Sequence, residues 1–269
     1  PAYYIEIGLK MKWLSVAFAI FTILTFGFAF NSVQSNTLSA ALGQAFGLSP
    51  VLIGVVTTIL TIIVIFGGIQ SIAKVSSVIV PIMAIGYILI AFIIIIVNIT
   101  QLPDVIKIIV SNAFGIEQAV GGGVGAALMQ GIRRGLFSNE AGMGSAPHAA
   151  ATANVSHPVK QGFIQALSVF TDTLMICSCT AFIILFSGSP LDGSINGVQL
   201  TQFALNNEIG SFGTYYIGFI LIFFVFSSIL GNYYYGEANV EYLVKNRGSE
   251  TRKKIIFLYR VLVSANVMA

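Results

Sequence analysis

Residues Gly135–Pro147 read GLFSNEAGMGSAP, and this stretch decides how the chain around it can fold. It holds one carboxylate, three glycines and short polar side chains such as Ser138 and Asn139 that compete with the backbone for hydrogen bonds, and two arginines directly precede it. The rest of the chain is different: 56% of the 269 residues are hydrophobic and only 9% are charged, against about 25% in a typical soluble domain. This composition predicts an all-α protein that crosses the membrane several times, so a polar and breakable stretch within it needs an explanation.

Apolar runs divide the chain into membrane spans. About 20 apolar residues in a helix cross the ~30 Å hydrocarbon core of a bilayer. Runs of this kind predict seven spans in a single transmembrane domain over residues 1–269: 14–46, 51–70, 78–99, 116–153, 160–187, 213–242 and 255–269. The polar region 188–212 is expected to be a surface connection. The first residue is not Met and the last apolar run is cut short, so we expect the sequence to be a fragment of a longer protein.

The basic residues support this number of spans. Lys and Arg collect in cytoplasmic loops of membrane proteins. When the loops are numbered alternately, nine basic residues fall on one side and one on the other, provided that 116–153 crosses an odd number of times. The nine are Lys10, Lys12, Lys74, Lys160, Lys245, Arg247, Arg252, Lys253 and Lys254, and the one is Lys107. The N-terminal end of the sequence is therefore expected to be cytoplasmic.

The region 116–153 is too long for one uninterrupted crossing. Its 38 residues would form a helix of roughly 57 Å, about twice the thickness to be crossed. The arginine pair favours a helix C-terminus, whereas Ser138, Asn139 and Glu140 favour the start of another helix. We therefore predict a helix that is broken near residues 135–140. One half ends near Arg134, the backbone unwinds over Gly135–Asn139, and the second half starts near Glu140.

A break of this kind points to a binding function. Unwound backbone at membrane depth is tolerated only where protein buries it or where it lines a wet cavity. Secondary transporters bind their substrates at broken helices, whose N-termini face anionic groups. Free N–H donors near Glu140 would bind a substrate carboxylate without a lysine. Two plainer arrangements stay open, namely a kinked helix and a long cytoplasmic loop that begins near Gly142.

Asp172 lies in the middle of the predicted span 160–187. An ionisable side chain in a membrane span is costly and is a functional candidate by default. We expect Asp172 to form an ion pair with Arg133 or Arg134, and the alternative is that it takes part in a proton or cation site.

Two further polar sets have two interpretations each. Asn31, Gln34 and Ser35 share one helical face, which either turns inward or forms a polar helix end at the outer surface. Ser227 and Ser228 either bond to their own helix backbone or offer oxygen ligands to a hard cation such as Na⁺. The sequence contains no recognisable set of metal ligands at suitable spacing and no nucleophile–base set typical of an enzyme.

The polar stretch belongs to a longer motif. Residues Gly131–Gly162 read GIRRGLFSNEAGMGSAPHAAATANVSHPVKQG and closely resemble the signature of the alanine or glycine:cation symporter family. Three other segments are similar to that family: FGGIQ at 66–70, VFTDTLMICSCTAFIILFSG at 169–188 and YYYGEANVEY at 233–242. The resemblance covers essentially the whole chain.

The resemblance implies a fold and a set of site residues. The fold would be a LeuT-like inverted-repeat transporter, of which this chain holds core helices three to nine, with 116–153 as the broken sixth helix. The first and tenth core helices would be missing. The residues that match the substrate pocket of the family are Gln34, Phe137, Ser138, Asn139 and Glu140, with Phe137 closing over a small side chain. Ser227 and Ser228 fall where LeuT-like folds supply hydroxyls to a sodium site.

The implied function is secondary transport and not enzymatic catalysis: Na⁺ influx would drive the uptake of alanine or glycine by alternating access. The expected partners are the amino acid, Na⁺ and membrane lipid, without nucleic acid and without a cofactor other than the coupling ion. The protein would be a multi-pass protein of the cell membrane, and its oligomeric state is not predicted. The alternative is a proton-coupled amino-acid transporter of the same fold in which Asp172 or Glu140 titrates. A channel and an intramembrane enzyme are alternatives from other classes.

Overall fold

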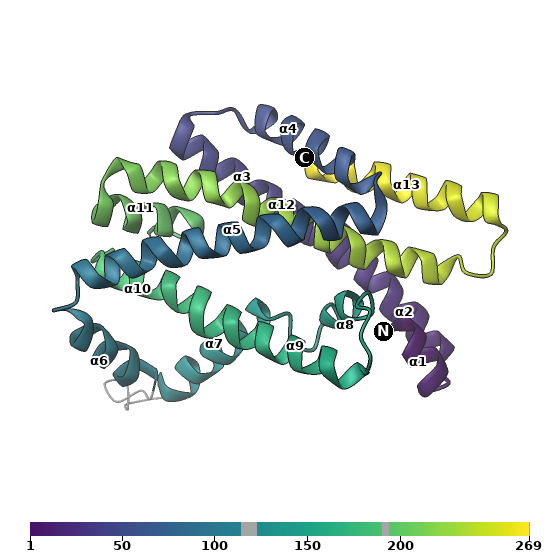
Figure 1. Cartoon of the computed structure of the whole chain (residues 1–269), viewed down its shortest axis with the longest axis horizontal. Helices are drawn as coiled ribbons and strands as arrows, with labels where there is room; N and C mark the ends of the chain where they lie inside the picture. The colour runs from purple at the N-terminus through teal and green to yellow at the C-terminus, as the bar shows by residue number, and fades with distance from the viewer. Residues whose placement is uncertain (114–122, 190–193, 269) are drawn as a thin grey trace. The chain divides into compact units, whose positions relative to one another are not determined.

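The computed structural model describes residues 1–113, 123–189 and 194–268, and every regular element in these ranges is helical (Figure 1). The all-α class predicted from the sequence is confirmed. Residues 116–122 of the predicted interrupted span lie outside the described residues, as does Ala269 of the predicted last span. The chain forms two compact units, which we describe in turn.

Unit 1 consists of Pro1–Met83, Pro147–Ala151 and Thr214–Ala269. It contains α1 (Ala2–Gly8), α2 (Lys12–Thr22), η1 (Ile23–Ala29), α3 (Phe30–Phe46), α4 (Pro50–Ile65) and α13 (Ser249–Met268), together with the first half of α5 (Gly68–Val97), most of α8 (Ala146–Ala150) and nearly all of α12 (Ser211–Leu243). The helix α13 packs against α3 and α4, which come from the opposite end of the sequence (Figure 1).

Unit 2 consists of Ala84–Ala146 and Thr152–Gly213. It contains the second half of α5, then α6 (Leu102–Ala113), α7 (Gly123–Ser138), α9 (Pro158–Thr171), η2 (Asp172–Cys177), α10 (Ser178–Phe186) and α11 (Val198–Ile209). Two of these helices lie where the sequence predicted connections: α6 follows the predicted third span, and α11 occupies much of the region 188–212.

Four continuous helices in the described ranges are long and apolar enough to cross a membrane: Lys12–Phe46, Gly68–Val97, Pro158–Phe186 and Ser211–Leu243. Two of the four contain a π-helical segment, η1 in the first and η2 in the third. The shorter apolar helix α4 begins at Pro50, where the side chain of Ser49 caps the N-terminus by accepting a hydrogen bond from the Leu52 N–H at 3.3 Å. Several long apolar helices agree with a polytopic membrane protein.

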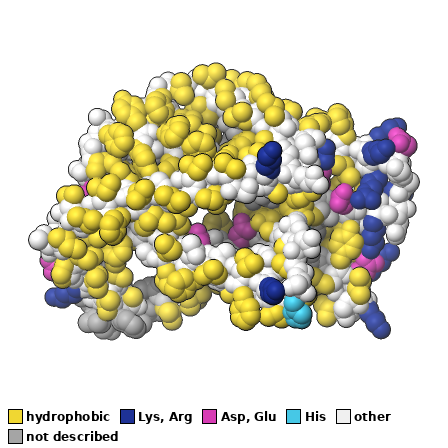
Figure 2. Space-filling view, in the orientation of Figure 1, with side chains coloured by type: hydrophobic (Ala, Val, Ile, Leu, Met, Phe, Trp, Pro, Cys, Tyr) yellow, Lys and Arg dark blue, Asp and Glu magenta, His cyan; other side chains and the backbone are white. Residues whose placement is uncertain are grey.

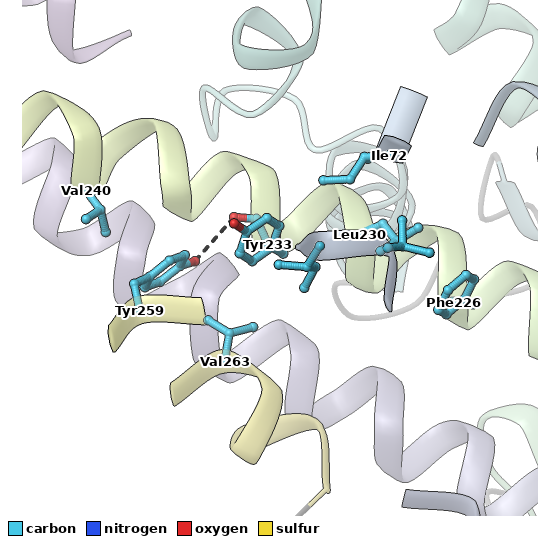
Figure 3. Packing of buried hydrophobic residues seen from close by; sticks show 9 residues of the cluster. Ile72, Phe226, Leu230, Tyr233, Val240, Tyr259 and Val263 are labelled. Atoms are coloured by element: carbon cyan, nitrogen blue, oxygen red, sulfur yellow. Dashed lines mark hydrogen bonds between the residues drawn. The ribbon is translucent and has the colours of Figure 1, made fainter. Parts of the chain in front are cut away.

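The core of unit 1 is built around two tyrosines (Figure 3). The cluster gathers buried side chains of four helices: Val64, Ile65, Ile72, Phe226, Leu230, Tyr233, Val240, Tyr259 and Val263. The rings of Tyr233 on α12 and Tyr259 on α13 stack with centroids 5.7 Å apart. The Tyr259 hydroxyl donates a hydrogen bond to the backbone oxygen of Tyr233 at 3.3 Å. Ring stacking and a satisfied hydroxyl together hold α13 against α12.

Two glycines let the Tyr259 ring approach the neighbouring backbones. A Cβ atom at Gly27 would lie 2.8 Å from the Tyr259 hydroxyl oxygen. A Cβ atom at Gly236 would overlap that oxygen and lie 2.8 Å from the ring carbon that carries it. Gly27 belongs to η1 and Gly236 to α12, so the hydroxyl of one α13 residue is enclosed by two other helices.

A partly buried ion pair lies beside this tyrosine pair. Arg260 Nη2 donates to Glu237 Oε1 at 2.8 Å, and Arg260 Nε lies 3.2 Å from the same oxygen. Arg260 Nε also donates to the Tyr233 hydroxyl at 3.0 Å. The side chains of Arg260 and Glu237 are 23% and 11% exposed, so most of each charge is shielded from solvent.

The two ends of unit 1 differ in charge. Glu6 of α1 forms an ion pair with Lys245, which follows α12, and accepts a hydrogen bond from the Tyr242 hydroxyl at 2.8 Å. Basic side chains gather in this part of the chain, where α12 leads into α13 (right-hand side of Figure 2). At the far end of α13, the Ser35 hydroxyl donates to the Val267 oxygen at 2.6 Å. Elsewhere large apolar side chains such as Phe21 and Ile63 are 69% and 66% exposed, as expected of surfaces that face lipid.

Candidate functional site

The helix α7 carries the first part of the polar stretch and ends at Ser138. The N–H of Ala141 donates to the Leu136 oxygen at 2.9 Å, and the N–H of Glu140 donates to the Phe137 oxygen at 3.1 Å. This pair of bonds defines a Schellman motif, which satisfies carbonyl groups that the end of the helix leaves free. The interruption therefore begins inside the predicted window.

The boundaries of the break differ from the prediction. We predicted that the backbone unwinds from Gly135 and that a second half-helix starts near Glu140, and both statements are wrong. Residues 135–138 are still helical, and the next helical residues after the turn are those of the five-residue helix α8. The reason is that Ser138 and Asn139 do not cap a following helix. Their side chains instead bond to another part of unit 2, and the cap belongs to the C-terminus of α7.

Glu140 occupies a position that usually belongs to glycine. Its φ angle is +50°, in the left-handed region, and it is the residue directly after the cap of α7. Only two non-glycine residues in the described ranges have positive φ, and Lys10 is the other. A left-handed conformation costs an L-residue about 1–2 kcal/mol, and such strain persists at functional sites when the surroundings impose it.

Two side chains at the end of α7 bond to two consecutive residues of η2. The Ser138 hydroxyl donates to Asp172 Oδ2 at 2.7 Å. The Asn139 amide nitrogen donates to Thr173 Oγ1 at 2.7 Å, and the Thr173 hydroxyl lies 3.1 Å from Asn139 Oδ1 as a donor. The Asn139 amide nitrogen also donates to the Gly135 oxygen at 2.9 Å. These contacts tie the interruption after α7 to the start of the π-helical segment.

The π-helix explains how this cluster forms. A π-helix bonds residue i to residue i+5, so side chains five apart are stacked along the same side. Asp172 and Cys177 are five apart, and both contact Ser138: the Cys177 Sγ lies 3.3 Å from the Ser138 Oγ and donates to Asp172 Oδ2 at 3.9 Å. In a regular α-helix of 3.6 residues per turn, residues five apart point in clearly different directions. Single π-helical turns inside α-helices frequently lie at functional sites.

The predicted ion pair of Asp172 with Arg133 or Arg134 is wrong for this structure. In the part of the chain that is described, no Lys or Arg lies within ion-pair distance of Asp172. The physical reason is position along α7. Ser138 lies one helical turn closer to the end of α7 than Arg134, and its short hydroxyl reaches Asp172 directly.

The other predicted site residues occupy separate places. Gln34 is half-buried on α3, on the helical face where Asn31 and Ser35 are buried, so the inward interpretation of that face holds for these two residues. The Ser227 hydroxyl donates to the Phe224 oxygen at 3.0 Å, which is the helix-backbone interpretation, and Ser228 is half-buried beside it. These residues belong to unit 1, whereas Phe137, Ser138, Asn139 and Glu140 belong to unit 2.

Sequence reasoning missed Thr173 and Cys177 as members of the cluster. Asp172 was recognised because an ionisable residue in an apolar run is conspicuous, but a threonine and a cysteine are common in membrane helices. The adjacency of Thr173 to Asp172 was the available signal. The π-helical register that brings Cys177 to the same side has no sequence signature that we could use.

Known proteins with similar sequences give the context of this site. The sodium:alanine symporter family matches residues 1–269. The chain is 51% identical over 268 residues to a protein of Bacillus subtilis (strain 168) named probable sodium/glutamine symporter GlnT, covering 100% of this chain and 55% of that protein. It is likewise 51% identical to the amino-acid carrier protein AlsT of the same organism, covering 100% and 56%.

A third relative from Bacillus subtilis (strain 168), a putative sodium/proton-dependent alanine carrier protein YrbD, is 44% identical over 278 residues and covers 98% of this chain and 57% of that protein. The chain thus spans little more than half the length of these curated relatives.

Proposed function

The chain belongs to the sodium:alanine symporter family, and from this premise we propose that the protein containing it is a secondary active symporter of the cell membrane. Na⁺ influx drives the uptake of alanine or glycine by alternating access, without covalent chemistry. The observation that carries the proposal is the interruption after α7, where Ser138 and Asn139 bond to η2 within an otherwise apolar part of the chain. Irregular backbone and polar side chains at membrane depth are typical of a substrate site in a secondary transporter.

In this proposal the substrate binds at the end of α7. Phe137 is 59% exposed and supplies an apolar surface for a small side chain. Ser138 and Asn139 supply polar groups, and Glu140 holds the strained turn. Gln34 of α3 stays a proposed substrate-binding residue on the family resemblance alone. Ser227 and Ser228 are the proposed hydroxyl ligands of Na⁺, whose preference is for oxygen. The proposed fold is the LeuT-like inverted repeat.

The membrane orientation is part of the proposal. The N-terminal end lies in the cytoplasm, because nine of the ten basic residues counted above then lie on that side. The contacts of Glu6 with Lys245 and Tyr242 support this orientation, since they bring two of the basic connections to one end of unit 1. Modification of cysteines introduced singly at Lys10 and at Lys107 by a membrane-impermeant reagent tests it: only the cysteine at 107 should react in intact cells.

The deciding experiment uses the full-length protein in proteoliposomes loaded with potassium. Labelled alanine is added outside with either an inward Na⁺ gradient or an equal choline gradient. We expect accumulation of alanine above its external concentration with Na⁺ alone, and competition by excess glycine. Uptake that is equal with choline would refute sodium coupling, and accumulation of glutamine without uptake of alanine would refute the substrate assignment.

Proton coupling is the second candidate, and one observation favours it. Asp172 is a carboxylate in an apolar helix that no Lys or Arg of the described chain neutralises, and a titrating carboxylate in a membrane span is typical of proton relays. A relative named as a putative sodium/proton-dependent alanine carrier gives a further reason to test proton coupling. Under this mechanism, alanine uptake would persist with a proton gradient in the absence of Na⁺, and Asp172→Asn would abolish it.

A further inference from the structure

The hydrogen bond between Ser138 and Asp172 determines which end of an amino acid the end of α7 can hold. We propose that Asp172 is a positioning residue that holds the hydroxyl hydrogen of Ser138, so that the Ser138 oxygen faces the ammonium group of the transported amino acid as an acceptor. The inference rests on the proposed function above. It goes further by naming the chemical group that is recognised and the residue that sets the recognition.

The first step is the number of donors on Ser138. A serine hydroxyl has one O–H donor and two acceptor lone pairs, and an ionised carboxylate can only accept. Because Ser138 lies 2.7 Å from Asp172 Oδ2, its single hydrogen is used in that bond. The oxygen therefore offers lone pairs, and no donor, to a ligand. A carboxylate ligand would find no donor on this side chain, whereas an ammonium group could donate a hydrogen bond to its oxygen.

The second step is the number of donors on Asn139. An asparagine amide nitrogen carries two N–H donors. One is directed to the Gly135 oxygen at 2.9 Å and the other to Thr173 Oγ1 at 2.7 Å. Both side-chain donors of Asn139 are thus used inside the protein, as is the single donor of Ser138. Thr173 holds the amide in this orientation.

The third step concerns the backbone donors of the turn. The N–H groups of Asn139, Glu140 and Ala141 donate to the oxygens of Gly135, Phe137 and Leu136 at 3.2, 3.1 and 2.9 Å. The free N–H donors that we had expected near Glu140 are therefore engaged in ending α7. A substrate carboxylate at residues 138–141 would lack partners from both side chains and backbone.

The fourth step is the charge at this place. The C-terminus of a helix carries a partial negative charge of about half an electron, so cations are stabilised there and anions are not. The Asp172 carboxylate adds a negative charge on the other side of Ser138, and no basic residue of the described chain pairs with it. Both contributions favour the ammonium end of a zwitterionic amino acid at Ser138.

The test is a double-mutant cycle on alanine uptake by the full-length protein in proteoliposomes. The proteins are the parent, Asp172→Asn, Ser138→Ala and the double variant Asp172→Asn/Ser138→Ala, with Asp104→Asn as the matched control. Asp104 is an exposed carboxylate in the first turn of α6, in the same unit, and its loss should leave both constants unchanged. The KM for alanine and the Na⁺ concentration for half-maximal uptake are measured for each protein.

Asp172→Asn removes the negative charge, and the amide no longer requires the Ser138 hydroxyl hydrogen to point to it. A hydrogen bond to a charged group exceeds a neutral one by on the order of 1 kcal/mol, so we expect the KM for alanine to rise about five- to tenfold in Asp172→Asn. The sodium constant should change less than twofold. In the Ser138→Ala background, Asp172→Asn should cause no further change, because the residue acts through Ser138.

Three results would overturn the inference. One is an equal rise of KM with and without Ser138, which would make Asp172 merely structural. Another is a change confined to the sodium constant, which would make Na⁺ the cation at this place. The third is an unchanged KM in Asp172→Asn. A parent protein that takes up no alanine would instead refute the proposed function. If Asp172→Asn is not recovered in the membrane, Asp172→Glu replaces it in the same cycle, with the same requirement that its effect disappears without Ser138.

Discussion

The Tyr259 ring lies against two glycines, Gly27 and Gly236. The distances from a Cβ atom at each glycine to the ring predict how a substitution changes the free energy of unfolding. In Gly236→Ala, the new methyl group would overlap the Tyr259 hydroxyl oxygen and lie 2.8 Å from the ring carbon that bears it. The ring cannot turn away easily, because it is 4% exposed, stacks on Tyr233 and has the backbone of Gly27 on the other side. We expect the helix to shift and the ring to lose its hydrogen bond to Tyr233.

The expected magnitude is the sum of these effects. Overpacking a well-filled core costs about 1–3 kcal/mol, and losing the hydrogen bond from Tyr259 to Tyr233 costs about 1 kcal/mol. Alanine in a helix interior gains about 0.5–1 kcal/mol over glycine. Gly231 on the same helix supplies the matched control, since a Cβ atom there meets nothing within 4 Å. Both variants gain the helix contribution, so the free energy of unfolding should be about 2–4 kcal/mol lower in Gly236→Ala than in Gly231→Ala.

The assay is thermal unfolding of the detergent-solubilised full-length protein, followed by retention of the monodisperse peak in size-exclusion chromatography. We expect Gly236→Ala to melt several degrees below Gly231→Ala. Tyr259→Phe should restore part of the loss in the Gly236→Ala background, because it removes the atom that the methyl group meets first. Equal melting of the two alanine variants would refute the argument that Tyr259 is enclosed at this point.

Three further predictions follow from other contacts. Glu140→Gly should raise the unfolding free energy by about 1 kcal/mol, since glycine adopts the +50° φ without strain, yet should lower alanine uptake; a variant that loses stability contradicts the Schellman assignment. Glu237→Gln should cost about 3 kcal/mol because it removes the carboxylate that compensates the mostly buried charge of Arg260, whereas the double variant Glu237→Gln/Arg260→Met should recover most of that in the same melting assay. Lys245 holds the pKa of Glu6 below its usual range, so Glu6→Gln should destabilise the protein at neutral pH, and the difference from the parent should vanish as the pH falls through that lowered pKa; a difference that persists in acid would contradict it.

Local patterns in the sequence carried the prediction of the membrane helices. Apolar runs such as 78–99 and 160–187 overlap the helices Gly68–Val97 and Pro158–Phe186, because the backbone in lipid must satisfy its own hydrogen bonds and therefore forms a long helix of apolar residues. The polar stretch after Arg134 likewise predicted a helix interruption, since glycine and short polar side chains weaken a helix locally. The helices α6 and α11 were missed because neither is long enough or apolar enough to register as a span.

The partners of the polar groups were decided by tertiary structure. Ser138, Asn139 and Glu140 have the residue types of a helix start, and by local preference they would begin a second half-helix. In the folded chain, bonds from Ser138 to Asp172 and from Asn139 to Thr173 claim the side chains that would have capped it, and Glu140 instead takes the left-handed position that ends α7. On charge alone, Asp172 was expected to pair with an arginine. The position of Ser138 at the end of α7 instead places the Ser138 hydroxyl within hydrogen-bond distance of Asp172.

Composition and local propensity act without regard to distant residues, so they suffice to predict that this chain is helical and membrane-embedded and that a helix is interrupted near residue 138. The tertiary structure alone decided which groups the break exposes. A hydrogen can be donated only once, and whether Ser138 offers its hydrogen or its lone pairs to a ligand depends on a carboxylate 34 residues away and on a π-helical turn that aims it.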